Sequence, residues 1–171
     1  MNLDQIQLQL NAYKENNQIL DAANYIVDTF DLNSENFAGF EFRYELEEKS
    51  VLLTTEGALG EIQTVKIPRN LFDFDLNLVL NLLAHEMLHV RQKEFGKVVE
   101  DKNEREFQCY YEMLFHTNFP QIPDASTFFQ KQFSEKAFTY YQRMSDNSEL
   151  QLKYKSQKEE IEKLLGSQSN V

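Results

Sequence analysis

The alternation of apolar and polar positions divides the chain into a first part of changing period and a helical second part. Apolar residues recur three and four positions apart over residues 3–13 and 17–30, which predicts two short amphipathic helices. The period changes to two over residues 40–46, as is typical of a half-buried strand. Strand patterns also occupy residues 51–55 and 62–67. Short connections join these segments, so they predict a small antiparallel meander of three strands, with a mixed sheet as the alternative.

The most apolar stretch of the chain is a predicted helix over residues 76–93. Asp73 or Asp75 can cap its N-terminus, and Gly96 marks its end. Because its N-terminal half is apolar almost all round, we expect this helix to be largely buried. Three further helices are expected, over residues 102–117, 125–145 and 149–165.

These elements predict an α+β protein in which the small sheet packs on the buried helix. The length of 171 residues and the hydrophobic fraction of 42% suit one domain with a sizeable core. Within that domain we expect four consecutive parts: N-terminal helices over 1–37, a core over 38–117, C-terminal helices over 118–165 and a frayed tail over 166–171.

The net charge of -11 disfavours two classes of partner. A negative surface repels phosphate backbones and anionic membrane surfaces, so we expect neither nucleic acid nor a membrane as a partner. The single cysteine, Cys109, excludes an internal disulfide and fits a reducing compartment. No secretory signal or membrane span is recognisable. The expected location is the cytoplasm, or a virion if the protein is encoded by a phage.

The buried helix carries the strongest chemical signal of the sequence, His85-Glu86-Met87-Leu88-His89. Histidines four residues apart lie on one helix face, so both imidazoles can bind one zinc ion. Glu86 points about a quarter-turn away from the two histidines, so it can accept a proton from a zinc-bound water without being a ligand. Without a partner such as a metal, two imidazoles and a carboxylate would be costly to bury in an apolar helix. The alternative is a pair of core histidines that bond to neighbouring groups.

A third protein ligand is expected from the next helix, since Phe95 stands where a third histidine would follow the motif. Glu104 shares a helix face with the apolar stripe of Phe107 and Tyr111, which makes it the favoured candidate, with Glu106 second. A different role for Glu104 is a capping box with Asp101.

The motif and the following sequence Glu104-Arg105-Glu106-Phe107-Gln108 resemble the minimal gluzincin metallopeptidases of bacteria and phages. The resemblance covers about residues 38–117 and implies a zincin-like core. It implies that His85, His89 and Glu104 bind Zn²⁺, that Glu86 is the general base, and that Gln108 holds a ligand histidine in place. The chain departs from the family pattern at Phe107, where a small residue is usual, and at Gln108, where Asp or Asn is usual.

Two functions follow as hypotheses. The first is a zinc-dependent metallopeptidase that hydrolyses peptide or protein substrates by metal-activated water. The departures on the second helix motivate the alternative, a metallopeptidase fold with reduced activity that serves in a larger assembly such as a phage particle. The C-terminal helices could then bind a protein partner or a second copy. His116, Tyr140 and Tyr141 are candidates to stabilise an oxyanion, but none of them is assigned.

Overall fold

The computed structural model describes residues 2–44 and 52–168 of the chain. Over these residues the protein is α+β, with seven α-helices and one small mixed sheet of three strands. The helices are α1 (Leu3–Glu15), α2 (Ile19–Thr29), α3 (Leu76–Gln92), α4 (Lys102–Phe115), α5 (Thr127–Arg143), α6 (Glu149–Lys153) and α7 (Lys155–Gln168). The strands are β1 (Phe37–Phe42), β2 (Thr54–Glu56) and β3 (Gln63–Ile67), and a 3₁₀ turn, η1 (Leu71–Asp73), precedes α3.

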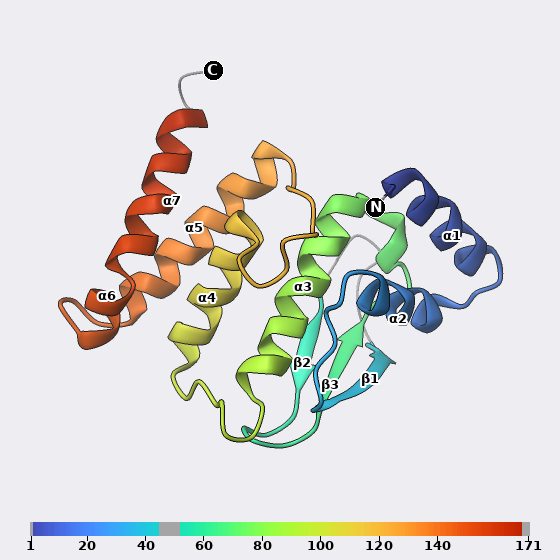
Figure 1. Cartoon of the computed structure of the whole chain (residues 1–171), viewed down its shortest axis with the longest axis horizontal. Helices are drawn as coiled ribbons and strands as arrows, with labels where there is room; N and C mark the ends of the chain where they lie inside the picture. The colour runs from blue at the N-terminus through green and yellow to red at the C-terminus, as the bar shows by residue number, and fades with distance from the viewer. Residues whose placement is uncertain (1, 45–51, 169–171) are drawn as a thin grey trace.

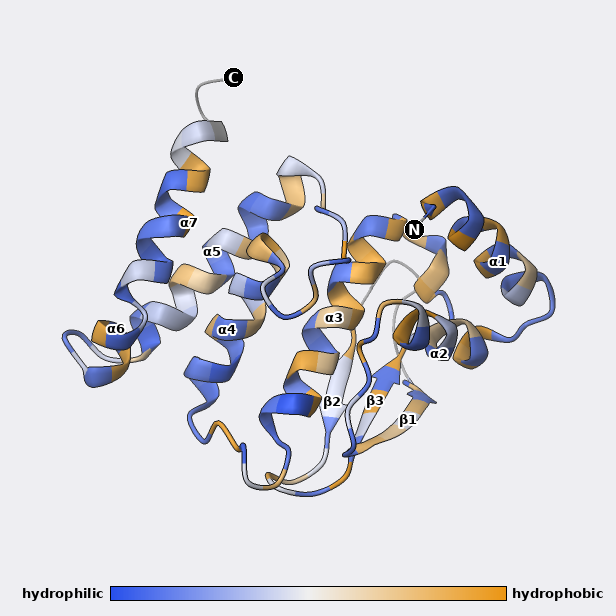
Figure 2. Cartoon of the chain, in the orientation of Figure 1, coloured by the Kyte–Doolittle hydropathy of each residue, from blue (hydrophilic) through white to orange (hydrophobic). Residues whose placement is uncertain are grey.

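Helix α3 occupies the middle of the molecule, between the sheet on one side and α4 on the other (Figure 1). Asp75 caps its N-terminus by accepting a hydrogen bond from the backbone N–H of Leu78, as one of the two sequence alternatives predicted. Most of its residues are buried, in agreement with the expectation from its apolar composition (Figure 2). A helix with two covered faces can hold polar groups away from bulk water on the side that meets α4.

The sheet differs from the expected meander of neighbouring strands. Its order is β1-β3-β2, with β1 parallel and β2 antiparallel to the central strand β3. The hairpin between β2 and β3 is short, whereas β1 reaches β3 only after the chain has passed through β2. Strand β2 therefore lies at an edge of the sheet and faces α3.

The alternation expected over residues 40–46 holds only in part. Phe40 is buried, but β1 ends at Phe42 and the side chain of Tyr44 is 82% exposed. The expected inward position of Leu46 lies outside the described residues, as does the start of the strand expected over 51–55.

Two apolar clusters stabilise the fold on opposite sides of α3. The first joins α1, α2, the sheet and the sheet-facing side of α3, with Ile26, Val65 and Leu83 among its fully buried members. The second joins α4, α5, α6 and α7 around Phe107 and Ile161. The C-terminal helices thus pack on α4 and on each other in the part of the chain that is described, with α5 beside α4 and α7 beside α5 (Figure 1).

Candidate metal centre

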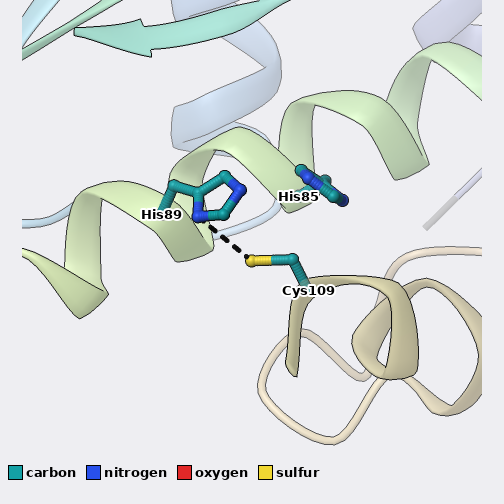
Figure 3. A group of neighbouring side chains, drawn as sticks. All are labelled: His85, His89 and Cys109. Atoms are coloured by element: carbon teal, nitrogen blue, oxygen red, sulfur yellow. Dashed lines mark hydrogen bonds between the residues drawn. The ribbon is translucent and has the colours of Figure 1, made fainter. Parts of the chain in front are cut away.

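Helix α3 places His85, Glu86 and His89 in the layer between the sheet and α4. Their exposed fractions are 7%, 8% and 8%, so the three polar residues are nearly removed from solvent. The four-residue spacing brings the two imidazoles together, with ring centroids 4.8 Å apart. Both side chains project from one face of the helix toward α4 (Figure 3).

Glu106, on the first turns of α4, faces both histidines. Its Oε2 lies 3.7 Å from Nε2 of His85 and 3.6 Å from Nε2 of His89. Two ligand atoms that each lie about 2.0–2.1 Å from a tetrahedral zinc ion are roughly 3.4 Å apart. The two distances from Glu106 are therefore close to the separation of two ligands on one ion.

The electrostatic environment keeps Glu106 ionised, as a metal ligand must be. Burial alone would raise the pKa of this carboxyl group, but hydrogen bonding and attraction from His85 and His89 lower it well below its ordinary value. A carboxylate between two imidazoles is the donor set expected of a His₂Glu zinc site.

The orientation of His89 leaves Nε2 available to an ion. Its Nδ1 lies 2.9 Å from Oε1 of Gln92, and an amide oxygen can only accept, so Nδ1 carries the proton. Gln92 is fixed in turn, because its Nε2 donates to Oε1 of Gln108 and to the backbone oxygen of Arg105. Gln108, the residue expected to hold a histidine, thus contacts His89 only through Gln92. Such outer contacts fix the tautomer and the direction of a metal-binding imidazole.

Cys109 lies beside Nδ1 of His89, the ring nitrogen opposite Nε2. His85, His89 and Cys109 form a buried group whose candidate ligand atoms lie within 4.8 Å of one another, so this group could hold a metal ion (Figure 3). The Sγ atom lies 3.5 Å from Nδ1 of His89, the nitrogen that also pairs with Gln92. The thiol is completely buried, and burial raises its pKa. Sequence reasoning passed over this residue because it considered only carboxylates and a histidine from α4.

Glu104, the ligand favoured by the sequence, does not face the histidines but contacts the C-terminal helices. Its side chain is buried, but its Oε1 accepts hydrogen bonds from Lys153 and Tyr154, each 2.6 Å away. It does not line the cavity at the histidines, whereas Glu106 does. Asp101 caps α4 by accepting from the backbone N–H of Glu104, which is half of the capping box considered from the sequence. The geometry therefore favours Glu106 over Glu104 as the third ligand.

A cavity of about 370 Å³ opens beside the histidines. It is lined by Leu52, Leu53, Thr54, Thr55, His85, Glu86, His89, Lys93, Lys102, Arg105, Glu106, Tyr110 and Tyr140. The hydroxyl of Thr55 donates to Oε2 of Glu86 at 2.7 Å, which joins the edge strand β2 to the motif. The cavity thus brings the edge strand, a buried carboxylate and the imidazole pair into one space.

Of the three residues considered for oxyanion stabilisation, only Tyr140 lines this cavity. His116 contacts Asn81 at 2.9 Å, and the hydroxyl of Tyr141 donates to the backbone oxygen of Gln151. Burial, with a further contribution from Glu106, raises the pKa of Tyr140, so its phenol stays protonated and can donate a hydrogen bond. Tyr110, whose ring packs on His85 and stacks on Tyr140, was not singled out from the sequence.

Comparisons with protein families, curated proteins and solved structures found no match to this chain. In the described part of the chain, no helix is long and apolar enough to cross a membrane.

Proposed function

We propose that the protein is a zinc-dependent hydrolase of the zincin type that cleaves peptide bonds. In this proposal His85, His89 and Glu106 hold Zn²⁺, and Glu86 is the general base. The observation that carries it is the near-equal distance from Oε2 of Glu106 to the two imidazole Nε2 atoms, 3.7 and 3.6 Å, beside a cavity that Glu86 also lines. The facing carboxylate and the adjoining open space together favour a metal site over a histidine pair that only bonds to neighbouring groups.

The residues around the cavity have complementary roles in such a reaction. Zinc, when bound, supplies Lewis acidity that polarises a carbonyl group and lowers the pKa of water. Glu86 accepts a proton from the attacking water and returns it to the leaving amine. Thr55 holds Oε2 of Glu86, which orients the carboxylate toward the cavity that it lines. The protonated phenol of Tyr140 is available to donate to the oxygen on which negative charge develops.

The edge strand supports an extended peptide as the substrate. Residues Leu52 to Thr55 line the cavity, and β2 pairs with β3 on one side only among the described strands. The edge of a sheet offers backbone groups to an extended chain, which aligns a peptide without requiring a particular sequence. A substrate lying along this wall would pass in front of Glu86.

The test compares wild type with Glu86→Gln, a variant that removes the base and leaves the proposed ligands. Both proteins are loaded with zinc, analysed for metal content by mass spectrometry, and incubated with an unstructured protein such as casein. We expect one zinc ion per chain in both proteins and a loss of cleavage of about 10²- to 10⁴-fold in Glu86→Gln. Equal cleavage by the two proteins, or no bound zinc in wild type, would contradict the proposal.

A second candidate function, an interaction role within a larger assembly, is favoured by exposed apolar side chains away from the cavity at the histidines. Phe95 is 84% and Ile62 is 62% exposed, and both line a separate hollow with Gly60. Large exposed apolar groups of this kind are common at protein interfaces. Native mass spectrometry of the wild-type chain distinguishes this function: a stable oligomer together with full zinc occupancy and no cleavage would favour it.

A further inference from the structure

Three cationic side chains gather at one end of the cavity described above. Lys93 follows the last residue of α3, and Lys102 and Arg105 belong to the first turns of α4. All three line the cavity together with the carboxylates of Glu86 and Glu106. This concentration of positive charge is unexpected in a chain with a net charge of -11.

The three cations form no direct ion pair with a carboxylate in the described part of the chain. Among the described residues, none of them has a carboxylate oxygen within 4.0 Å, although five other lysines form such pairs: Lys14, Lys66, Lys97, Lys153 and Lys158. Arg105 instead donates to the backbone oxygens of Val99 and Glu100. Lys93 donates to the backbone oxygens of Thr55 and Gly57. These neutral acceptors hold Lys93 and Arg105 in place without a direct ion pair.

The cations also act on one another. Burial lowers the pKa of Lys93, and the charge of Arg105 lowers it further, against the opposing influence of Glu86 and Glu106. A divalent ion at the histidines would balance the two carboxylates and leave three positive charges around the cavity. A bound anion would relieve this repulsion, which is the arrangement that proteins use to select charged ligands.

We propose that the cavity selects peptides that carry a carboxylate close to the scissile bond, and that Lys102 and Arg105 receive it. The proposal rests on the proposed peptidase function and adds the substrate class. The carboxylate can belong to an Asp or Glu side chain or to the C-terminus of the peptide, since both present the same charged group to a guanidinium or an ammonium.

The experiment measures cleavage and binding separately. Zinc-loaded wild type is given unstructured peptides that differ only in carrying Glu, Gln or Lys beside a common central sequence, each with a free or an amidated C-terminus. Cleavage is followed by mass spectrometry as kcat/KM, and binding of the same peptides to Glu86→Gln is followed by fluorescence anisotropy. Lys102→Glu reverses one charge of the cavity. Lys131→Glu makes the same change at an exposed lysine of α5 that does not line the cavity.

We expect wild type to prefer the Glu peptides over the Gln peptides by about fivefold or more, and Lys102→Glu to abolish that preference while Lys131→Glu retains it. Dependence on a free C-terminus identifies the terminal carboxylate as the selected group, and independence from it identifies the side chain.

Cleavage of all peptides at one rate would overturn this inference and leave the peptidase function intact. Preferential binding of Glu peptides to Glu86→Gln, lost in the double variant with Lys102→Glu, would support the inference even if wild type cleaves none of them. An absence of preferential binding and of preferential cleavage overturns it.

Discussion

Glu106 and His89 face each other across the boundary between α3 and α4, with Oε2 of the carboxylate 3.6 Å from Nε2 of the imidazole. The opposite nitrogen of the same ring is held by Gln92 at 2.9 Å. His89 is therefore fixed on one side by a neutral amide and presented on the other to an anion. This is the orientation that a metal-binding imidazole requires.

The first prediction concerns Glu106. Because its carboxylate is the proposed third ligand, Glu106→Gln should lower the affinity for zinc by at least about 100-fold, since an amide oxygen is neutral and a much weaker donor. Affinity can be measured by competition with a chromogenic chelator. A variant that binds zinc as tightly as wild type would exclude Glu106 from the site.

The second prediction assigns Glu104 a structural role. Its Oε1 accepts from Lys153 and from the buried Tyr154, which connects α4 to the C-terminal helices. Glu104→Gln should lower the free energy of unfolding by about 1–2 kcal/mol, because two charge-assisted hydrogen bonds are weakened. The loss is no larger because Lys153 is largely exposed, and exposed ion pairs contribute little to stability. Urea denaturation gives this value, and zinc content should stay at one ion per chain. Loss of zinc without loss of stability would indicate that Glu104 is a zinc ligand.

The contrast between these glutamates shows how far the sequence predicts the site. The spacing of His85, Glu86 and His89 on an apolar helix was sufficient to predict that these side chains lie together and buried, because side-chain positions within one helix follow from its period. The sequence was not sufficient to choose between Glu104 and Glu106, although Glu104 is buried as its position on the helix predicted. Helix α4 is covered by α3 on one side and by the C-terminal helices on others, so burial alone does not reveal which neighbour a side chain faces.

The arrangement of the sheet was likewise predictable from the sequence only in part. The strands β2 and β3 were predicted near their observed positions because their patterns and the turn between them are local. The parallel pairing of β1 with β3 depends on contacts between segments more than 20 residues apart, such as Phe40 opposite Val65. A pattern of alternating residues specifies a buried face but not the neighbouring strand.

The third prediction decides between the two metal arrangements that the histidines permit. If zinc binds Nε2 of His89 together with Glu106, Cys109→Ser should keep zinc bound at near wild-type affinity, because Sγ lies beside the opposite nitrogen, Nδ1, and beside Oε1 of Gln92. If the His-His-Cys group is the site, this variant should lose zinc while Glu106→Gln retains it. The spectrum of the cobalt-substituted protein gives an independent readout, since a thiolate ligand adds a strong charge-transfer band near the ultraviolet and a carboxylate does not.

The fourth prediction concerns Gln92, which joins His89 to Gln108. Gln92→Met should lower zinc affinity by about 10- to 100-fold, because the imidazole loses the acceptor that fixes its tautomer. Gln92→Glu is the matched variant: it keeps an acceptor for Nδ1 but loses the donor to Gln108 and Arg105. It should therefore retain more of the affinity than Gln92→Met. Equal losses in the two variants would indicate that Gln92 acts through packing rather than through His89.

The last prediction concerns removal of the metal from the whole protein. His85, His89 and Glu106 meet in the folded state only through the packing of α3 on α4, so zinc should bind the native chain far more tightly than the unfolded one. At a free zinc concentration 100 times the dissociation constant, this linkage stabilises the native state by about 2.7 kcal/mol. Scanning calorimetry with and without a chelator should therefore show a lower melting temperature for the metal-free protein. Glu106→Gln should melt at nearly the same temperature under both conditions, whereas Glu104→Gln should keep the zinc-dependent shift. A shift that persists in Glu106→Gln but disappears in Cys109→Ser would place the ion on the thiol side of His89.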